Sequence, residues 1–163
     1  MRRALWILAL PSLGLLLWAL WPVDEREQAR SLPERAAAAF ADGRIADCLA
    51  RFAPDFSDRS AGQTFDRDTI RAVMLGLLHQ RHRSIDVHIG EGSAVLEDFD
   101  AAAGTARVRC EVVVTGGARV ADPERAASWA VAVDAAVGRG PDGEWRILRS
   151  EHRTLAGRAP YGR

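Results

Sequence analysis

Polar side chains on predicted inward faces are the first candidates for chemistry in this chain of 163 residues. Arg81 extends the apolar stripe of a predicted helix by one turn, so its guanidinium points to the interior or its mouth. Arg149 and Glu151 continue the face of Trp145 on the last predicted strand. Such groups bind an anionic or hydrogen-bonding ligand, or they pair with each other. We favour a structural role, with a ligand site as the alternative.

Two tryptophans complete the set of candidate pocket-lining residues. Trp145 lies on the inward face of the last strand, and Trp129 lies on a strand that is apolar on both faces. Large rings of this kind either line a pocket or fill it. The candidate pocket residues are therefore Arg81, Arg149, Glu151, Trp129 and Trp145.

The four histidines do not form a predicted site. His79 and His82 have the spacing of a chelating pair, but no third ligand lies near them, so no metal ion and no cofactor are predicted. His88 and His152 fall on outward faces of their strands. Either would act as a general base only if a slip in register reversed its strand. Without an inward histidine or aspartate, we do not favour an acid–base enzyme.

Both cysteines, Cys48 and Cys110, are predicted to point inward as small core residues. A disulfide between them is the alternative, if the second helix crosses the long strand near its middle in an oxidising compartment. Neither cysteine has the neighbouring histidine or basic helix end that activates a catalytic thiolate.

Residues 4–23 carry no charge and are long enough to span a bilayer as a helix. The run exceeds the apolar core of a signal peptide and lacks a small-residue cleavage site, so an uncleaved anchor is preferred to a cleaved signal. Arg2 and Arg3 precede it while Asp24 and Glu25 follow it, which favours residues 1–3 inside the cell and the domain outside. We therefore predict a single-pass protein of a bacterial cytoplasmic membrane.

The charge balance argues against one class of partner. The 22 basic and 22 acidic residues cancel, so no overall field attracts nucleic acid. A protein partner, a second copy of the chain, and a small apolar or anionic ligand all stay open as partners.

Three helices are predicted after a polar linker at residues 24–30. Ser31 and Glu34 have the spacing of a capping box, and Gly43 is a predicted left-handed end to the first helix. The second helix has its apolar stripe at Ile45, Cys48, Leu49 and Phe52, followed by a loop at residues 57–64. Asp66 is predicted to cap a third helix, with an apolar stripe at Ile70, Val73, Met74, Leu77 and Leu78.

The pattern then alternates with period two, which predicts strands. Residues 85–89 and 94–99 are predicted to form a hairpin, and residues 105–115, 128–137 and 144–153 give three more strands. The last residues, 154–163, are predicted to be a flexible tail. The chain is thus predicted to be α+β, with three N-terminal helices packed on a curved, mainly antiparallel sheet of about five strands.

This order of elements, the run Cys48-Leu-Ala-Arg-Phe-Ala-Pro-Asp-Phe56 and the closing Asp142-Gly-Glu-Trp-Arg-Ile147 resemble the nuclear transport factor 2-like superfamily, including its SnoaL-like members. The resemblance covers residues 31–153 and implies a cone with an open-ended pocket. In that superfamily the pocket serves isomerases, dehydratases and hydrolases in some members and only binding or dimerisation in others. Fold alone therefore does not decide the function.

Two functions follow as hypotheses. The preferred one is a membrane-anchored, non-catalytic domain that binds a protein or a small ligand. The alternative is a SnoaL-like isomerase, dehydratase or hydrolase acting on a small apolar substrate in the cone. An ionisable pair within hydrogen-bond reach in a deep pocket would favour the enzyme, whereas a cone filled by Trp129, Trp145 and phenylalanines would exclude it.

Overall fold

The structure is a computed structural model, and it describes residues 24–60, 62–79, 84–117 and 127–157. The predicted anchor at residues 4–23 and the candidate Arg81 lie outside these ranges. Within them, no helix combines the length and the apolar character needed to cross a bilayer.

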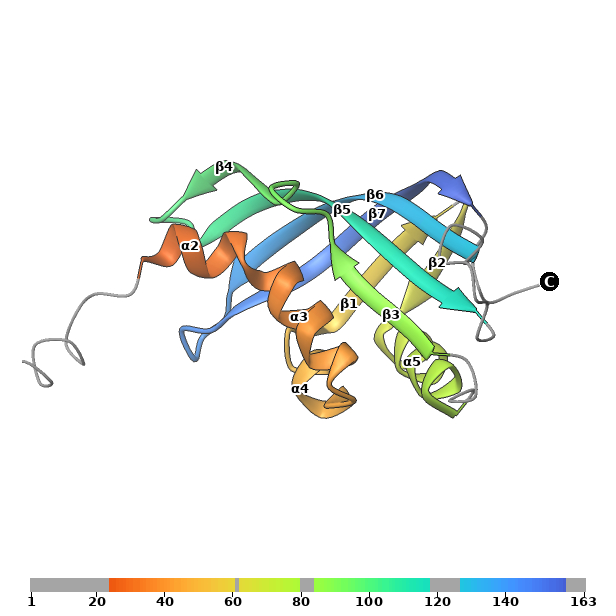
Figure 1. Cartoon of the computed structure of the whole chain (residues 1–163). Coiled ribbons are helices and arrows are strands. Elements are labelled where there is room, and N and C mark those ends of the chain that lie inside the picture. The colour runs from red at the N-terminus through yellow and green to blue at the C-terminus, as the bar shows by residue number, and fades with distance from the viewer. Residues whose placement is uncertain (1–23, 61, 80–83, 118–126, 158–163) are drawn as a thin grey trace, which may run out of the picture.

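Helices come first, and one more helix interrupts the strands (Figure 1). The helices are α2 (Glu25–Arg30), α3 (Leu32–Ala41), α4 (Ile45–Leu49) and α5 (Arg67–His79). The strands are β1 (Phe52–Ser60), β2 (Gln63–Asp66), β3 (Ser84–Ile89), β4 (Val95–Asp100), β5 (Thr105–Gly117), β6 (Ala127–Arg139) and β7 (Trp145–Gly157). The predicted α+β class is confirmed.

The chain is helical earlier than predicted. Residues 25–30, predicted as a linker, form α2, and the Asp24 carboxylate caps it by accepting from the backbone N–H of Arg26 at 2.9 Å. The capping box is not formed, because the Ser31 hydroxyl donates to the carbonyl of Glu27 at 2.7 Å. Two helices in succession leave Ser31 at their junction, where the preceding turn already supplies an acceptor. Gly43 has the predicted left-handed conformation, with φ of 72°.

The largest difference concerns residues 52–66. The second helix ends at Leu49, and the stretch predicted as its end and a loop forms β1 and β2, an antiparallel pair. Pro54 and Asp55 suggest a loop, but both are exposed, while Ala53, Phe56 and Asp58 are buried. A register shift between Phe52 and Ser57 accommodates the proline within the strand. Asp66 then caps α5, as predicted, by accepting from the Thr69 N–H at 2.8 Å.

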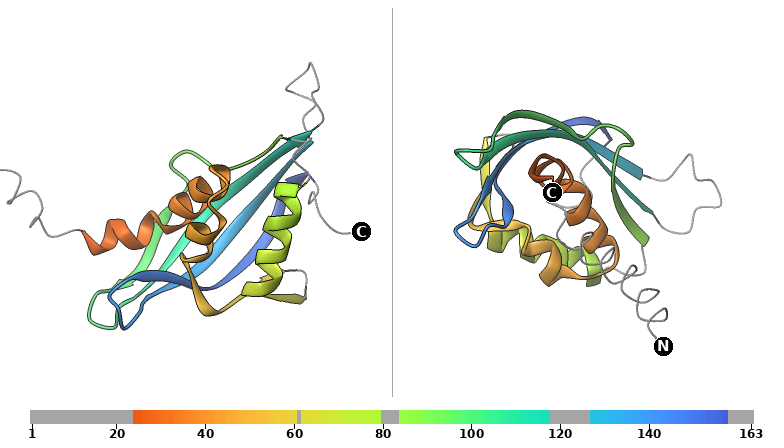
Figure 2. Two further views of the ribbon diagram at one scale, coloured as in Figure 1. Left: turned by 90° about the horizontal axis from the view of Figure 1, so that it is seen from below. Right: turned by 90° about the vertical axis from the view of Figure 1, so that its left-hand side faces the viewer.

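Seven strands form one mixed sheet in the order β2-β1-β7-β6-β5-β3, with β4 also paired to β5. The pair β1–β7 is parallel and the others are antiparallel. The predicted hairpin of residues 85–99 is not formed, because β3 and β4 pair in succession with the two halves of β5. The sheet curves around the helices, which lie on its concave side (Figure 2).

A β-bulge in β7 decides which side chains reach that concave side. Val137 of β6 pairs with Ile147, but the preceding Ala136 pairs with Arg149, so Leu148 is an extra residue in β7. Gly138 makes room for it, since a Cβ at that position would lie 2.7 Å from Leu148 Cδ1. One inserted residue exchanges the two faces of the strand beyond it. Trp145 and Ile147 are buried as predicted, but after the bulge the inward positions are Ser150 and His152.

The core sits at the end of the cone nearest α2. Leu32 and Ala29 are fully buried there against Val108, Val137 and Trp145. Burial of this kind stabilises a domain by about 25 cal/mol for each Å² of apolar surface. The core closes this end of the cone and leaves the rest of the concave side less filled.

Deleting Leu148 tests the bulge. The deletion restores strict alternation and turns Arg149 and Glu151 into the apolar interior, so it should destabilise the protein by more than about 3 kcal/mol. The matched control is Leu148→Ala, which keeps the chain length; because Leu148 is 40% exposed, it should cost less than about 1 kcal/mol. Chemical denaturation followed by circular dichroism measures both. Equal stability of the deletion and the wild type would contradict the assignment.

Candidate active site

An apolar cavity of about 250 Å³ opens between the helices and the sheet. Its walls come from α3, α4 and α5 on one side and from β1, β3, β5, β6 and β7 on the other. The α5 side chains that line it include Ile70, Val73, Met74 and Leu77. A cavity of about 150 Å³ already accommodates benzene, so this one has room for a small hydrocarbon skeleton. The cone is therefore not filled by aromatic side chains.

Three polar side chains interrupt the apolar lining at one place. They are Asp58 of β1 and, from β7, Ser150 and His152. In the parallel pair, Asp58 lies directly opposite Ser150, and His152 is two residues further on the same face of β7. The sheet itself therefore brings the three side chains together.

Asp58 and His152 form a close polar pair. His152 Nδ1 lies 2.8 Å from Asp58 Oδ2, and Asp58 is only 5% exposed. A carboxylate beside Nδ1 favours the neutral tautomer that carries its proton on Nδ1, and that tautomer has its lone pair on Nε2, where it can accept a proton. The same carboxylate stabilises the imidazolium after proton uptake. The pair is thus arranged as a general base with its orienting acid.

Ser150 completes the environment of the carboxylate. Its hydroxyl donates to Asp58 Oδ1 at 2.5 Å, while the other oxygen of the buried carboxylate lies next to His152 Nδ1. This geometry differs from that of a nucleophilic serine, whose hydroxyl must donate to the histidine. The arrangement favours proton transfer by His152 over acyl transfer through Ser150.

Trp129 holds the histidine ring from the side. The two rings meet edge to face, with centroids 5.8 Å apart and an interplanar angle of 83°. The indole Nε1–H donates to the Thr154 hydroxyl at 3.1 Å, which fixes the indole in turn. Trp129 also lines the cavity. The indole thus packs against one side of the His152 ring.

The other predicted pocket residues lie elsewhere. Trp145 is buried in the core and stacks on Phe99, with centroids 5.8 Å apart, and it is not part of the cavity lining. Arg149 and Glu151 lie on the opposite face of the sheet from the one predicted, because Leu148 reverses the strand. The ion pair of Glu151 is with Arg59, at 3.7 Å, rather than with Arg149.

Asp58 and Ser150 were missed, and His152 was predicted on the outward face, whereas it lines the cavity; β7 contains a signal that could have found Ser150 and His152. Arg149, Glu151 and Arg153 are charged at alternate positions, which marks a wet face on that side. Under strict alternation these charged residues would share a face with the buried Trp145 and Ile147. One residue must therefore be inserted between the buried positions and the charged ones. For Asp58 the only signal is its spacing from Phe56 in a stretch rich in turn-forming residues.

The other predicted histidine position does not contribute to this cavity. His88 is half exposed and lies 3.6 Å from the carboxylate of Asp86, as expected for the outward face of β3. The side chains of His79 and His82 lie outside the described part of the structure. Within its described part, no cluster of three or more metal-ligating side chains occurs.

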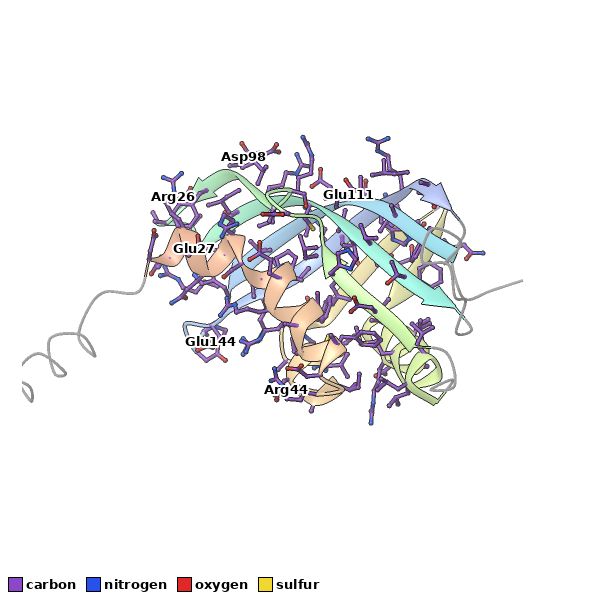
Figure 3. All side chains as sticks on the ribbon, in the orientation of Figure 1. Arg26, Glu27, Arg44, Asp98, Glu111 and Glu144 are labelled. Carbon is purple, nitrogen blue, oxygen red and sulfur yellow. The ribbon has the colours of Figure 1, made fainter. Side chains whose placement is uncertain are left out.

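The outer face of the sheet carries a second, polar hollow of about 450 Å³. Its charges are balanced, since it is lined by three arginines and three acids: Arg59, Arg107, Arg149, Asp98, Asp134 and Glu151. Arg107 and Asp134 form an ion pair there at 2.8 Å. Asp98 projects away from the helices (Figure 3). The interior and exterior of the sheet thus differ sharply in polarity.

Both cysteines line the cavity as free thiols. Cys48 Sγ lies 3.9 Å from Met74 Sδ, which joins α4 to α5. Burial raises the pKa of each thiol to about 11, against the opposing influence of Arg51 at Cys48 and with that of Glu34 at Cys110. Thiols of this kind stay protonated at neutral pH and act as small apolar wall groups.

Comparison with known proteins identifies the fold. No protein-family model matches the chain, and no curated protein matches it either. Solved structures do match. An NTF2-like (nuclear transport factor 2-like) protein with a cystatin-like fold from Novosphingobium aromaticivorans has a TM-score of 0.66 at 24% identity, covering 88% of this chain and 90% of that one.

The chain has the nuclear transport factor 2-like fold. A ketosteroid isomerase-like protein from Erwinia carotovora atroseptica matches over 82% of this chain and 98% of its own, with a TM-score of 0.60 and 15% identity. The beta subunit of benzoate 1,2-dioxygenase from Burkholderia mallei matches over 76% and 86%, with a TM-score of 0.58 and 11% identity. The predicted resemblance to nuclear transport factor 2-like proteins is confirmed, and identities this low establish the fold alone.

The raised pKa values of the two thiols should make the stability of the protein depend on pH. Between pH 9 and 11 the unfolded chain has lost its thiol protons while the folded chain retains them, so the free energy of unfolding should fall as pH rises. We expect a fall of roughly 1 kcal/mol or more per thiol. The chain has no lysine and only one tyrosine, so few other groups titrate in this window.

The measurement is thermal or chemical unfolding of the reduced protein at pH 8 and at pH 10.5. The double variant Cys48→Ala with Cys110→Ala is the control, and its stability should change much less over the same interval. A wild type and a double variant with the same pH dependence would show that the thiols do not have raised pKa values.

Proposed function

We propose that the protein is an enzyme that transfers a proton on a small, mostly apolar substrate, in the manner of an isomerase or dehydratase. The observation that carries this proposal is the Asp58–His152 pair, which lies at 2.8 Å in the wall of an apolar cavity. This proposal replaces the non-catalytic binding domain that was preferred from the sequence. That preference rested on the lack of an inward histidine or aspartate.

His152 is the proposed base. Its Nε2 takes a proton from the substrate, Asp58 stabilises the resulting imidazolium through Nδ1, and the same nitrogen returns the proton to a neighbouring substrate atom. In an elimination, the imidazolium gives its proton to the departing hydroxyl group. Ser150 and Trp129 are positioning residues, because one holds the carboxylate and the other holds the imidazole ring.

The lining indicates the kind of substrate. No arginine is among the described residues that border the cavity, and the polar groups gather at Asp58 and His152. A bound carboxylate or phosphate would find no cation to pair with there. An uncharged molecule with one polar end, directed to His152, fits this distribution. The ketosteroid isomerase-like neighbour supports an enzyme of this type by analogy of fold.

Proton exchange tests the proposal without knowledge of the natural substrate. The full-length protein is incubated in D₂O with a panel of small cyclic β,γ-unsaturated ketones, and ¹H NMR measures loss of the α-proton signals and shift of the double bond. His152→Ala should lower the rate about 100-fold or more, because general base catalysis contributes about that much. Asp58→Asn should also lower it, because the amide no longer selects the tautomer.

Ser150→Ala is the matched control, since it removes one hydrogen bond to Asp58 but leaves the histidine pair intact, and its rate should fall less than about tenfold. The proposal is wrong if no ketone that binds in the cavity exchanges faster with the wild type than with His152→Ala. Binding without exchange would support the non-catalytic alternative.

We also propose that residues 4–23 anchor the protein in a bacterial cytoplasmic membrane, with the domain on the outer side. The charge-free run of residues supports this location, and so do the arginines that precede it. The domain begins directly afterwards, since Asp24 already caps α2. The catalytic pair would then act beside the membrane, outside the cytoplasm.

Fractionation tests the location. Full-length protein should stay with the membranes after an alkaline carbonate wash, whereas the chain lacking residues 1–23 should be released. Protease added to intact spheroplasts should digest the domain. Release of the full-length protein by carbonate, or a mass that shows a cut near residue 23, would instead establish a cleaved signal peptide.

A further inference from the structure

The reaction proposed for His152 needs a partner for an oxygen of the substrate. When a base removes a proton beside a carbonyl group, negative charge develops on the carbonyl oxygen, and in an apolar site that charge must meet a donor or a cation. No arginine lines the cavity in the part of the chain that the structure describes, and the chain has no lysine. Within these residues the partner is therefore an uncharged donor.

Most side-chain donors in the cavity wall already have a partner. The Ser150 hydroxyl, the Trp129 indole N–H and the Cys48 thiol each donate to a neighbouring side chain. His152 Nδ1 lies beside a carboxylate, and its Nε2 is needed as the base. Among the described wall residues, the Cys110 thiol alone has no acceptor, although Cys110 is only 3% exposed.

The register of the sheet places Cys110 and His152 in one row. Val133 on β6 pairs with Cys110 on β5 and with His152 on β7, and all three side chains line the cavity. Neighbouring strands lie about 4.8 Å apart, so the Cα atoms of Cys110 and His152 are about 10 Å apart, with Val133 between them. The inner face of the sheet is concave (Figure 2), and side chains on a concave face converge. The gap between thiol and imidazole therefore suits a small group, such as a carbonyl and its α-carbon.

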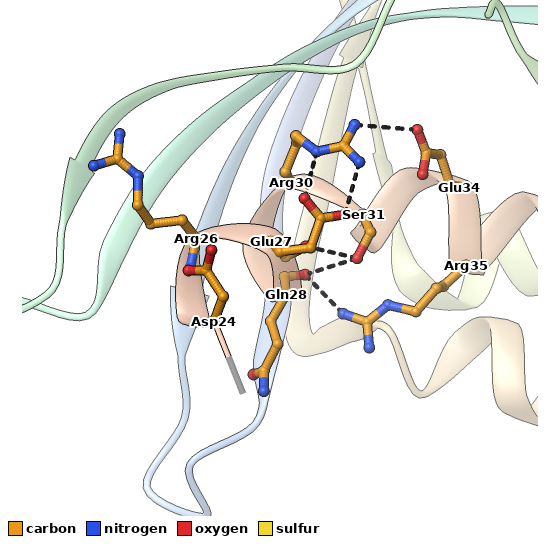
Figure 4. A network of polar contacts seen from close by, with 8 residues as sticks. All are labelled: Asp24, Arg26, Glu27, Gln28, Arg30, Ser31, Glu34 and Arg35. Carbon is orange, nitrogen blue, oxygen red and sulfur yellow. Dashed lines mark hydrogen bonds and ion pairs between the residues drawn. The ribbon is translucent and has the colours of Figure 1, made fainter. Parts of the chain in front are cut away.

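The surroundings of Cys110 keep its proton on sulfur. Burial raises the pKa of this thiol to about 11, and the negative charge of Glu34 acts in the same direction. The Glu34 carboxylate is itself directed to Arg30 on α2, with 3.5 Å between its Oε1 and Arg30 Nη1 (Figure 4). A thiol is a weak donor in water, but a hydrogen bond is electrostatically stronger in an apolar interior. The S–H group of Cys110 is therefore available to a ligand in the cavity.

We propose that the Cys110 thiol donates a hydrogen bond to the carbonyl oxygen of the substrate, which makes the substrate an uncharged ketone or aldehyde. This inference rests on the proposed proton transfer by His152. The α C–H bond breaks, its proton goes to His152 Nε2, and its electron pair forms a C=C bond while the carbonyl electrons move to the oxygen. Cys110 keeps its own proton and shares it with that oxygen. When the imidazolium returns its proton to carbon, the electrons move back and the carbonyl group is restored.

Infrared spectroscopy tests this contact directly, because the S–H stretching band lies where other protein groups do not absorb. The chain has two cysteines, so the full-length Cys48→Ala variant keeps only the Cys110 thiol. Saturating cyclohexanone should move its S–H band to lower frequency, whereas cyclohexane, which has no oxygen, should leave the band in place. In Cys110→Ala, the band of the remaining Cys48 thiol should not move with cyclohexanone.

Exchange rates separate a catalytic role of Cys110 from a merely structural one. With the panel of ketones in D₂O, Cys110→Ala should exchange α-protons at least about tenfold more slowly than Cys48→Ala, which removes the same sulfur atom from another part of the cavity wall. Cys110→Ser should recover most of this loss, because a hydroxyl group also donates. A thiol that only filled space would be replaced better by alanine than by serine.

The inference is overturned if none of the ketones binds, as measured by saturation-transfer NMR, or if bound cyclohexanone leaves the Cys110 band unchanged. Exchange that is lost in His152→Ala but is equally fast in Cys110→Ala and Cys48→Ala would also overturn it, while the proposed function would stand. A shifted Cys110 band without any exchange by the wild type would support the contact with the carbonyl oxygen and would overturn the proposed function instead.

Discussion

The Asp58 carboxylate lies in the wall of an apolar cavity, where an ionised group is stable only if donors meet its oxygens. The two polar partners of this carboxylate, Ser150 and His152, come from one neighbouring strand. The parallel pairing of β1 with β7 puts Ser150 opposite the carboxylate, and the pleat puts His152 within reach two residues later. Other features near the cavity can be understood as the means of holding this group of three side chains in place.

The bulge at Leu148 is the first of these means. Without it, β7 would present Arg149 and Glu151 to the cavity, and Asp58 would have no donor from that strand. The bulge requires space on β6, which Gly138 provides. The contacts of Asp58 with Ser150 and His152 thus depend on one inserted residue in β7 and on the absence of a side chain at Gly138.

The same bulge explains which features of the structure could be predicted from the sequence and which could not. The helix α5 with its Asp66 cap, the long strands and the buried Trp145 and Ile147 follow from local periodicity and turn residues. The Asp58–His152 pair does not, because a bulge changes the phase of a strand while leaving its composition unaltered. The strand β1 could not be predicted from the sequence either, since Pro54 and Asp55 give it the composition of a loop. In both cases the deciding information lies in the pairing with a distant strand.

The first helix connects these features to the position of the whole domain. Glu25 pairs with Arg139, and the Arg26 guanidinium lies 5.2 Å from the Phe99 ring centroid, so α2 is fixed to the sheet from its first turn. Ala29 and Leu32 are then fully buried in the core. The folded domain begins at Asp24, which caps α2, directly after the predicted anchor at residues 4–23 in the sequence. If those residues span a membrane, the fixed position of α2 restricts the orientation of the domain relative to the bilayer.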